Sequence, residues 1–132
     1  MERKAISPWT WQEHFGFDQA CETKGAQRTL WCTGQASTDD DGHPIHAGDL
    51  HAQLHRSFDN LETVLAAAGY SLADVVRLVL YATDPDALLA IWDELRTRLA
   101  AGSCSPALTL VGVSRLAYPE LLVEIEATAV TA

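Results

Sequence analysis

Two stretches of the chain repeat apolar residues at three- and four-residue steps, which predicts two amphipathic helices. In the first, Asp49 can cap the start and Gly69 can end the helix. Its apolar stripe consists of Leu50, Leu54, Phe58, Leu61, Leu65 and Ala68. The second begins at Asp84, has Pro85 at its first position and stops at Gly102. Its stripe consists of Leu88, Ile91, Trp92, Leu95 and Leu99.

Short β-branched segments between and after these helices predict strands. They read VVRLVLYAT from residue 75, ALTLVGV from residue 107 and LLVEIEATAV from residue 121. Upstream, DQACETKGAQRTLWCTG predicts two strands that turn near Lys24 and Gly25, the second over Thr29 to Thr33. The predicted order of elements is therefore ββαβαββ.

The central run VVRLVL is almost continuously apolar, which is typical of a strand covered on both faces. Two helices can cover only one face of such a sheet, so other subunits must close the second face. Because a contiguous exposed apolar face is rare on a soluble monomer, a homo-oligomer is expected. Arg77 interrupts the run, and by parity it shares a face with Val79 and Tyr81.

The last predicted strand places two carboxylates on one face. Val123, Ile125 and Ala127 alternate with Glu124 and Glu126. On a solvated face this pattern is ordinary, whereas on a covered face at least one glutamate would be a buried acid that needs a partner or a chemical role.

Length and composition indicate one domain, spanning residues 1–132, in which 48% of residues are hydrophobic. With no run of about 18 apolar residues and no signal-like start, a soluble, cytoplasmic protein without membrane contact is expected. Cys21, Cys32 and Cys104 fit neither a disulfide framework nor a zinc ribbon, so reduced, mostly buried thiols are predicted. The net charge of -9 would repel nucleic acid.

Other chemical signals are weak. His43, His46, His51 and His55 suggest a metal site, but no H-E-x-x-H pattern is present, and helical histidines more often lie on a solvated face. The DDDG stretch lacks the later ligands of a calcium loop and is interpreted as a turn. No nucleophile elbow or phosphate-binding loop occurs. For each of Trp9, Trp11, Trp31 and Trp92, packing is the simpler role, with pocket lining open for Trp92.

Several segments, taken in order, resemble the reactive intermediate deaminase (Rid, YjgF-like) family. They are FGFDQA from residue 15, TGQ from residue 33, LHAQLHRSFDNLETVLAAAGYSLADVVRLVLYATD from residue 50, SPALT from residue 105, SRL from residue 114 and LVEIEATAV from residue 122. The resemblance covers nearly everything from Phe15 onward and leaves residues 1–14 as an N-terminal extension.

This resemblance implies an α+β, chorismate-mutase-like single domain whose mixed sheet carries two helices on one face. It also implies a homotrimer with small-molecule clefts between subunits, and no metal or organic cofactor. Active members of the family hydrolyse enamines and imines derived from amino acids to ketones or 2-keto acids and ammonia. An enzyme of this kind is a deaminase-like hydrolase.

On this resemblance Glu124 matches the cleft glutamate that orients water and transfers protons, although a purely structural role stays open. A partly desolvated glutamate has a raised pKa, which suits proton transfer near neutral pH. Thr33 and Gly34 match a segment whose backbone would hold a water or a substrate oxygen. For Glu126 a structural hydrogen-bonding or ion-pair role is the simpler interpretation, and for Arg115 a structural ion pair.

Four departures from the family pattern all replace polar groups by apolar ones. The arginine that clamps a substrate carboxylate is matched by Leu108, and a tyrosine by Phe17. A frequent asparagine is matched by Trp92, and the position two after the arginine is Leu110. Since leucine cannot pair a carboxylate, turnover of ordinary 2-aminoacrylate is not expected.

Two functions follow as hypotheses. The first is deaminase-like hydrolysis or proton transfer on an imine, enamine or enolisable carbonyl of an apolar metabolite, for example in secondary metabolism. The alternative is a non-catalytic trimer that binds a metabolite or another protein and has lost deaminase activity. Ribonuclease activity, also attached to the family, is disfavoured by the acidic charge and the lack of a basic aromatic groove.

Overall fold

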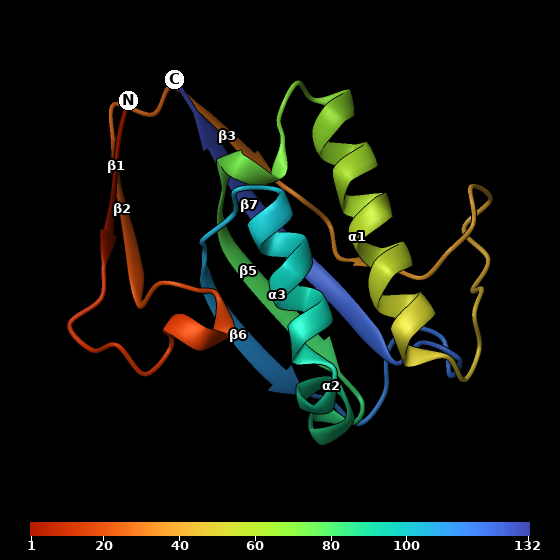
Figure 1. Ribbon diagram of the computed structural model, residues 1–132. Coiled ribbons are helices and arrows are strands. Elements are labelled where there is room, and N and C mark those ends of the chain that lie inside the picture. Colours follow the sequence, from red (N-terminus) through yellow and green to blue (C-terminus); the bar gives the residue numbers. More distant parts are fainter.

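A computed structural model describes all 132 residues as a mixed sheet with helices on one face and an open second face (Figure 1). The strands are β1 (Glu2–Ile6), β2 (Ala20–Lys24), β3 (Arg28–Trp31), β4 (Gln35–Ala36), β5 (Val75–Ala82), β6 (Ala107–Gly112) and β7 (Val123–Thr131). The helices are α1 (Leu50–Ala67), α2 (Pro85–Ala90) and α3 (Trp92–Ala101), with short 3-10 turns at Glu13–Phe15 and Leu72–Asp74. This architecture confirms the α+β prediction.

The main sheet has the strand order β3-β7-β5-β6, and β4 also pairs with β7. β5 and β6 are parallel, whereas β7 runs antiparallel to β3, β4 and β5. The parallel pair is connected by α2 and α3, which return the chain across the helix face of the sheet (Figure 1). β7 therefore lies inside the sheet, and β6 forms one of its edges.

The first helix follows its prediction closely. Asp49 caps α1, because its Oδ1 accepts a hydrogen bond of 3.0 Å from the Ala52 N–H. Gly69 follows the helix with φ of +82°, a conformation that a side chain would strain. The stripe residues Leu54, Phe58 and Leu61 are fully buried. Helix start, stop and buried face are thus all encoded locally.

The second helix differs from its prediction, because it is broken into α2 and α3 at Ile91. Ile91 has φ of -113° and ψ of 19°, outside the helical region. Leu88, Trp92 and Leu95 are nevertheless all buried, so the apolar stripe continues across the break. Because the spacing of buried apolar residues is the same on both sides of the break, the sequence pattern could not predict it.

The N-terminal strands also differ from the prediction. β2 and β3 flank the turn at Lys24 and Gly25 but do not pair with each other: β2 pairs with β1, and β3 pairs with β7. The second predicted strand lies at Arg28–Trp31 rather than Thr29 to Thr33. β1 was not predicted, because its five residues are all exposed and show no apolar alternation.

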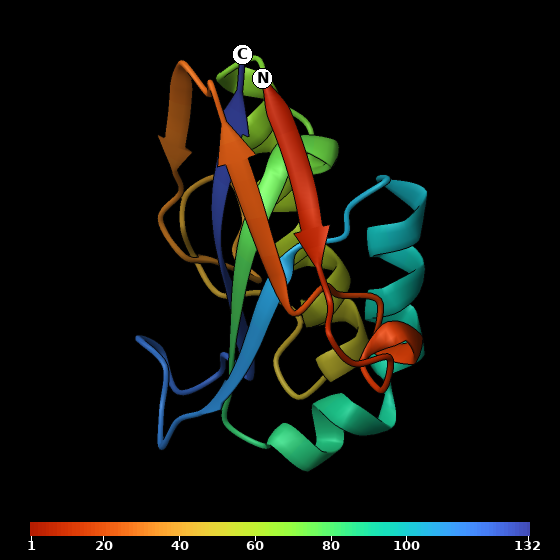
Figure 2. The same ribbon diagram turned by 90° about the vertical axis from the view of Figure 1, so that its left-hand side faces the viewer.

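The Arg3 side chain ties the N-terminal extension to the main body. The Arg3 guanidinium donates to the carbonyls of Ala73, Val75 and Ser105, at 2.8, 3.1 and 3.2 Å. In the side view the β1–β2 pair stands beside the β6 edge of the main sheet (Figure 2). The β1–β2 pair therefore forms a separate two-stranded sheet beside this edge.

A single hydrophobic core fills the space between the helices and the sheet. On the sheet side it includes Leu78, Leu80, Ile125 and Ala127. All three cysteines are free, with Cys32 and Cys104 buried and Cys21 half-buried, as predicted. No helix combines the length and the apolar character that crossing a membrane requires.

Candidate functional site

An apolar pocket of about 190 Å³ opens beside the β6 edge of the sheet. Its lining consists of Trp11, Phe15, Phe17, Leu89, Trp92, Leu108 and Leu110. Leu108 and Leu110 on β6 lie opposite Leu78 and Leu80 of β5, which belong to the buried core, so they point to the helix side of the sheet. Four of the predicted substrate-binding residues therefore share one pocket.

Aromatic contacts fix the walls of this pocket. The Phe15 ring stands edge-on to Trp92 with centroids 6.0 Å apart, and Trp11 stands edge-on to Phe17 at 6.3 Å. Trp92 is 7% exposed, and its Nε1 donates a hydrogen bond of 2.9 Å to the Phe15 carbonyl. The indole thus has a satisfied polar end and presents an apolar body. Trp11 comes from the N-terminal extension, and nothing in the sequence pattern predicted its place here.

Glu124 lies on the opposite face of the sheet. Along β7 it alternates with the fully buried Val123 and Ile125, and its Cα faces Ala36 of β4 on one side and Tyr81 of β5 on the other. Its side chain is half-buried and has no hydrogen-bond partner within the chain. Burial raises the pKa of the Glu124 carboxyl, and the negative charge of Glu126 raises it further.

The Glu124 carboxylate occupies the space where a side chain of residue 34 would lie, so only glycine fits at this position. A Cβ atom placed on Gly34 would overlap Glu124 Oε1 and lie 2.9 Å from its Cδ, so any side chain at this position would displace the acid. The N–H groups of Thr33 and Gly34 donate no backbone hydrogen bond. Thr33 itself is exposed. The acid therefore lies against a glycine backbone whose neighbouring donors are free.

Two hydrogen-bonded polar pairs share the open face with Glu124. The Tyr81 hydroxyl donates to Glu126 Oε2 at 3.4 Å, and Arg77 donates to Thr109 Oγ1 at 2.8 Å. Burial and the charge of Glu126 raise the pKa of Tyr81, so its phenol stays protonated near neutral pH. Arg77 shares the face of Tyr81, as parity predicted.

The predicted site residues thus form two groups separated by the sheet. Phe17, Trp92, Leu108 and Leu110 line the helix-side pocket, whereas Thr33, Gly34 and Glu124 belong to the open face. One chain does not bring the groups together, because alternate residues of a strand point to opposite faces.

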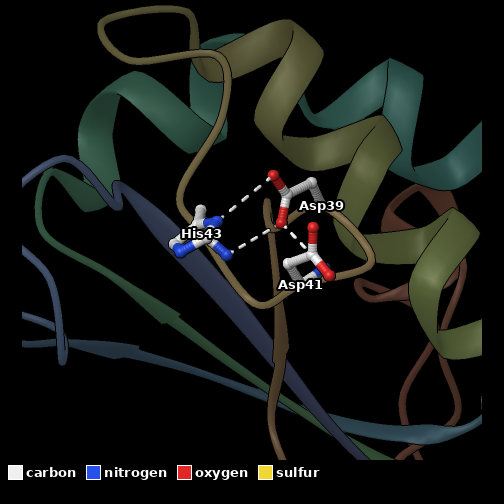
Figure 3. A group of neighbouring side chains, drawn as sticks. All are labelled: Asp39, Asp41 and His43. Atoms are coloured by element: carbon white, nitrogen blue, oxygen red, sulfur yellow. Dashed lines mark hydrogen bonds and ion pairs between the residues drawn. The ribbon is translucent and has the colours of Figure 1, made fainter.

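Two other candidates have structural explanations. The Asp39 carboxylate accepts hydrogen bonds from the N–H groups of Asp41 and His43, at 3.0 and 2.9 Å, which closes a turn as predicted (Figure 3). These three side chains lie close enough to share a cation, but the same contacts are explained by the turn. Arg115 donates to the carbonyls of Leu116 and Ala117 in its own loop and forms no ion pair within the chain.

Comparison with known proteins agrees with this architecture. The profile of the family described as Endoribonuclease L-PSP matches residues 15–131. A RutC family protein of Pyrococcus horikoshii is 36% identical over 100 residues, covering 76% of this chain and 77% of its own. Protein DfrA of Myxococcus xanthus is 33% identical over 132 residues, covering 99% of this chain and 98% of its own.

Among solved structures, a Yersinia pestis protein of unknown function, the Rid family member YyfB, is similar with a TM-score of 0.87. It is 39% identical, and the match covers 99% of this chain and 100% of that one. Because the profile spans most of the chain and the relatives share both sequence and fold, this chain belongs to the Rid (YjgF-like) family.

Proposed function

We propose that this protein acts on an imine, enamine or enolisable carbonyl of an apolar metabolite by deaminase-like hydrolysis or proton transfer. The observation that carries this proposal is the half-buried Glu124, which has no partner in the chain and packs against Gly34. A carboxyl with a raised pKa and free access is suited to general acid and base chemistry. The resemblance to active members of the Rid family implies the same reaction class.

The working site forms in a homotrimer, between one subunit's apolar pocket and the next subunit's Glu124. Two features support this arrangement: the two groups lie on opposite faces of one sheet, and the open face carries the half-buried Val79 and Tyr81. If the open face of one copy packs near the β6 edge of the next, these side chains become buried. The same packing brings Glu124 of the first copy toward the pocket of the second. The trimer itself is part of the proposal.

In the proposed hydrolysis, protonated Glu124 gives its proton to the imine nitrogen while water adds to the imine carbon. The carboxylate then takes a proton from the added water, and the carbinolamine collapses to the carbonyl compound and ammonia. The free N–H groups of Thr33 and Gly34 would hold the water or the developing oxygen. An enamine would first accept the proton on carbon.

The lining of the pocket favours a neutral, apolar substrate. All seven lining residues are hydrophobic, and Leu108 lies at the position matched to the family's carboxylate-binding arginine. A carboxylate held here without a cation would lose its hydration and cost several kcal/mol, on the order of the penalty for an unpaired buried charge. A volume of about 190 Å³ fits one ring or a branched aliphatic group.

The same lining also favours the alternative function. If the pocket holds an apolar metabolite without turnover, the trimer is a binding protein that has lost deaminase activity. The two possibilities differ in what Glu124 does: an enzyme needs its proton, and a binding protein does not.

The test measures ammonia and carbonyl release from imines generated in situ by amino-acid oxidases and amine oxidases, with and without a carboxylate. Wild type, Glu124→Gln and Leu108→Arg are compared, with Glu126→Gln as the matched control on the same face. We expect turnover of carboxylate-free imines by wild type, and a loss of roughly 10²–10⁴-fold in Glu124→Gln.

Full activity in Glu124→Gln would show that the acid is assigned wrongly. If wild type turns over nothing while calorimetry detects the neutral imine's stable ketone analogue bound equally by wild type and Glu124→Gln, the binding function replaces the catalytic one. Turnover only in Leu108→Arg would mean that the scaffold keeps its acid but has abandoned the family substrate.

A further inference from the structure

We propose that His51, His55 and Glu94 form a zinc-binding site that joins α1 to α3. This site is separate from the proposed function and uses none of its residues. The sequence alone favoured solvated histidines over a metal site, because it contains no H-E-x-x-H pattern. The fold brings a carboxylate to both histidines from a helix about 40 residues further along the chain.

Both imidazoles contact one carboxylate, that of Glu94. His51 and His55 are four residues apart and therefore share one face of α1. His51 Nδ1 lies 2.5 Å from Glu94 Oε2, and His55 Nε2 lies 3.1 Å from Glu94 Oε1. Ligand atoms around a tetrahedral zinc with bonds of about 2.0–2.1 Å are roughly 3.3 Å apart. The three groups do not yet lie within 4.8 Å of one another, so the two imidazoles must rotate toward each other to share an ion with Glu94.

The electrostatic surroundings favour a cation. Three further carboxylates, Asp59, Glu62 and Asp93, lie around Glu94 along the α1–α3 groove. They outnumber the two nearby guanidinium groups, Arg96 and Arg98, which are already paired with them. An excess of negative charge at the site, on a chain with net charge of -9, concentrates divalent cations from solution.

The two histidines and one glutamate favour zinc over magnesium or calcium. Two imidazoles and one carboxylate suit zinc and other borderline divalent ions better than Mg²⁺ or Ca²⁺, which prefer oxygen alone. The histidine side chains are 62% and 41% exposed, and an open groove of about 550 Å³ lined by His55 and Glu94 adjoins them. Three protein ligands with solvent access leave the fourth position to water.

The Asp39, Asp41 and His43 turn is the natural comparison within the same chain (Figure 3). It offers two carboxylates and one imidazole, but its groups come from a single loop and its Asp39 oxygen is engaged by backbone N–H groups. A variant there changes the same residue types without touching the α1–α3 ligands. His43→Gln is therefore the matched control.

The test titrates reduced, metal-free, full-length protein with Co²⁺, followed by visible d–d absorption, and with Zn²⁺, followed by calorimetry and thermal unfolding. Wild type should bind one zinc per chain and unfold at a higher temperature when zinc is present. His51→Gln, His55→Gln and Glu94→Gln should each weaken binding at least about tenfold, since losing even a group that only supports a ligand costs roughly 10–100-fold.

His43→Gln should keep wild-type affinity and the zinc-dependent rise in unfolding temperature. Circular dichroism and the unfolding temperature without metal show whether each variant is folded. The proposal is overturned if zinc does not bind saturably, if affinity is unchanged in all three ligand variants, or if His43→Gln alone removes it. A strong sulfur-to-cobalt charge-transfer band would instead assign the ion to a cysteine, which also overturns the proposal.

Discussion

The helix side and the open side of the main sheet offer a ligand different things. On the helix side, aromatic and aliphatic groups enclose a small pocket without a charged side chain. On the open side, Glu124 is half-buried beside free backbone N–H groups, with Tyr81 and Glu126 close by. Under the proposed function the helix side would provide the shape of the site and the open side its proton, so one chain alone would not form a complete site.

The largest expected effect comes from a variant that prevents the open face of one subunit from packing against another subunit. Val79→Asp places a charge on the half-buried centre of the open face, where a trimer would desolvate it at a cost of several kcal/mol. Sedimentation velocity should detect monomers, and any turnover should be lost with the trimer. Ala100→Asp, which adds the same charge on the exposed side of α3, should leave the mass unchanged.

If Val79→Asp and wild type have the same mass, the open face is not the interface, and the proposed cleft is wrong. Retained turnover in a proven monomer would lead to the same conclusion.

A second change alters only the open side. Gly34→Ala places a methyl group where the Glu124 carboxylate lies, so either the acid rotates away or the strands shift. We expect a loss of about 1–3 kcal/mol in the free energy of unfolding, as for other overpacked sites, together with reduced turnover. Chemical denaturation and kinetics of the folded variant measure both effects.

The control for this change is a double-mutant cycle with Glu124→Ala. Shortening the acid should make Gly34→Ala nearly neutral for stability, which gives a coupling of about 0.5–3 kcal/mol. Additive effects would mean that the close approach does not determine the cost.

A third change alters only the helix side. Trp92→Phe removes the hydrogen bond to the Phe15 carbonyl and widens the pocket. Stability should fall by about 0.5–1.5 kcal/mol, and affinity for small apolar ligands should fall with it. Trp9→Phe, at an exposed tryptophan, should change unfolding by less than about 0.5 kcal/mol. Equal effects at the two positions would argue against a structural role of the indole N–H.

The smallest effect is a pH dependence of stability. Because burial raises the pKa of Glu124 in the folded protein, the folded state keeps this proton at pH values where the unfolded chain, with a pKa of about 4.3, has lost it. As pH rises through this window, wild type loses stability relative to Glu124→Gln, and the difference then levels off above the folded pKa. Denaturation of both proteins at one concentration and several pH values measures it.

Glu120→Gln, which removes an exposed acid from the preceding loop, controls for the loss of one negative charge. If wild type instead gains stability relative to Glu124→Gln as pH rises, the raised pKa is contradicted.

The sequence predicted those parts of the fold whose signals are local. The cap at Asp49, the stop at Gly69 and the parity of Glu124 depend on neighbouring residues alone, and the structure confirms them. The break at Ile91 and the pairing of β2 with β1 were missed for a physical reason. The first leaves the buried stripe intact, and the second depends on a polar strand held by the distant contacts of Arg3.

The candidate site divides in the same way. Periodicity and resemblance predicted Leu108, Leu110 and Glu124, but Trp11 and Glu94 reach their places through tertiary contacts that no spacing records. That the sheet separates the two groups follows from strand register.

The fit between Gly34 and Glu124 also restricts the order in which mutations can accumulate. A lineage that abandons the chemistry can shorten Glu124 at once, since this only opens space beside a glycine. Adding a side chain at position 34 first is the more costly order, because it passes through an overpacked intermediate. Loss of the acid followed by loss of the glycine is therefore the less destabilising route to alanine at both positions.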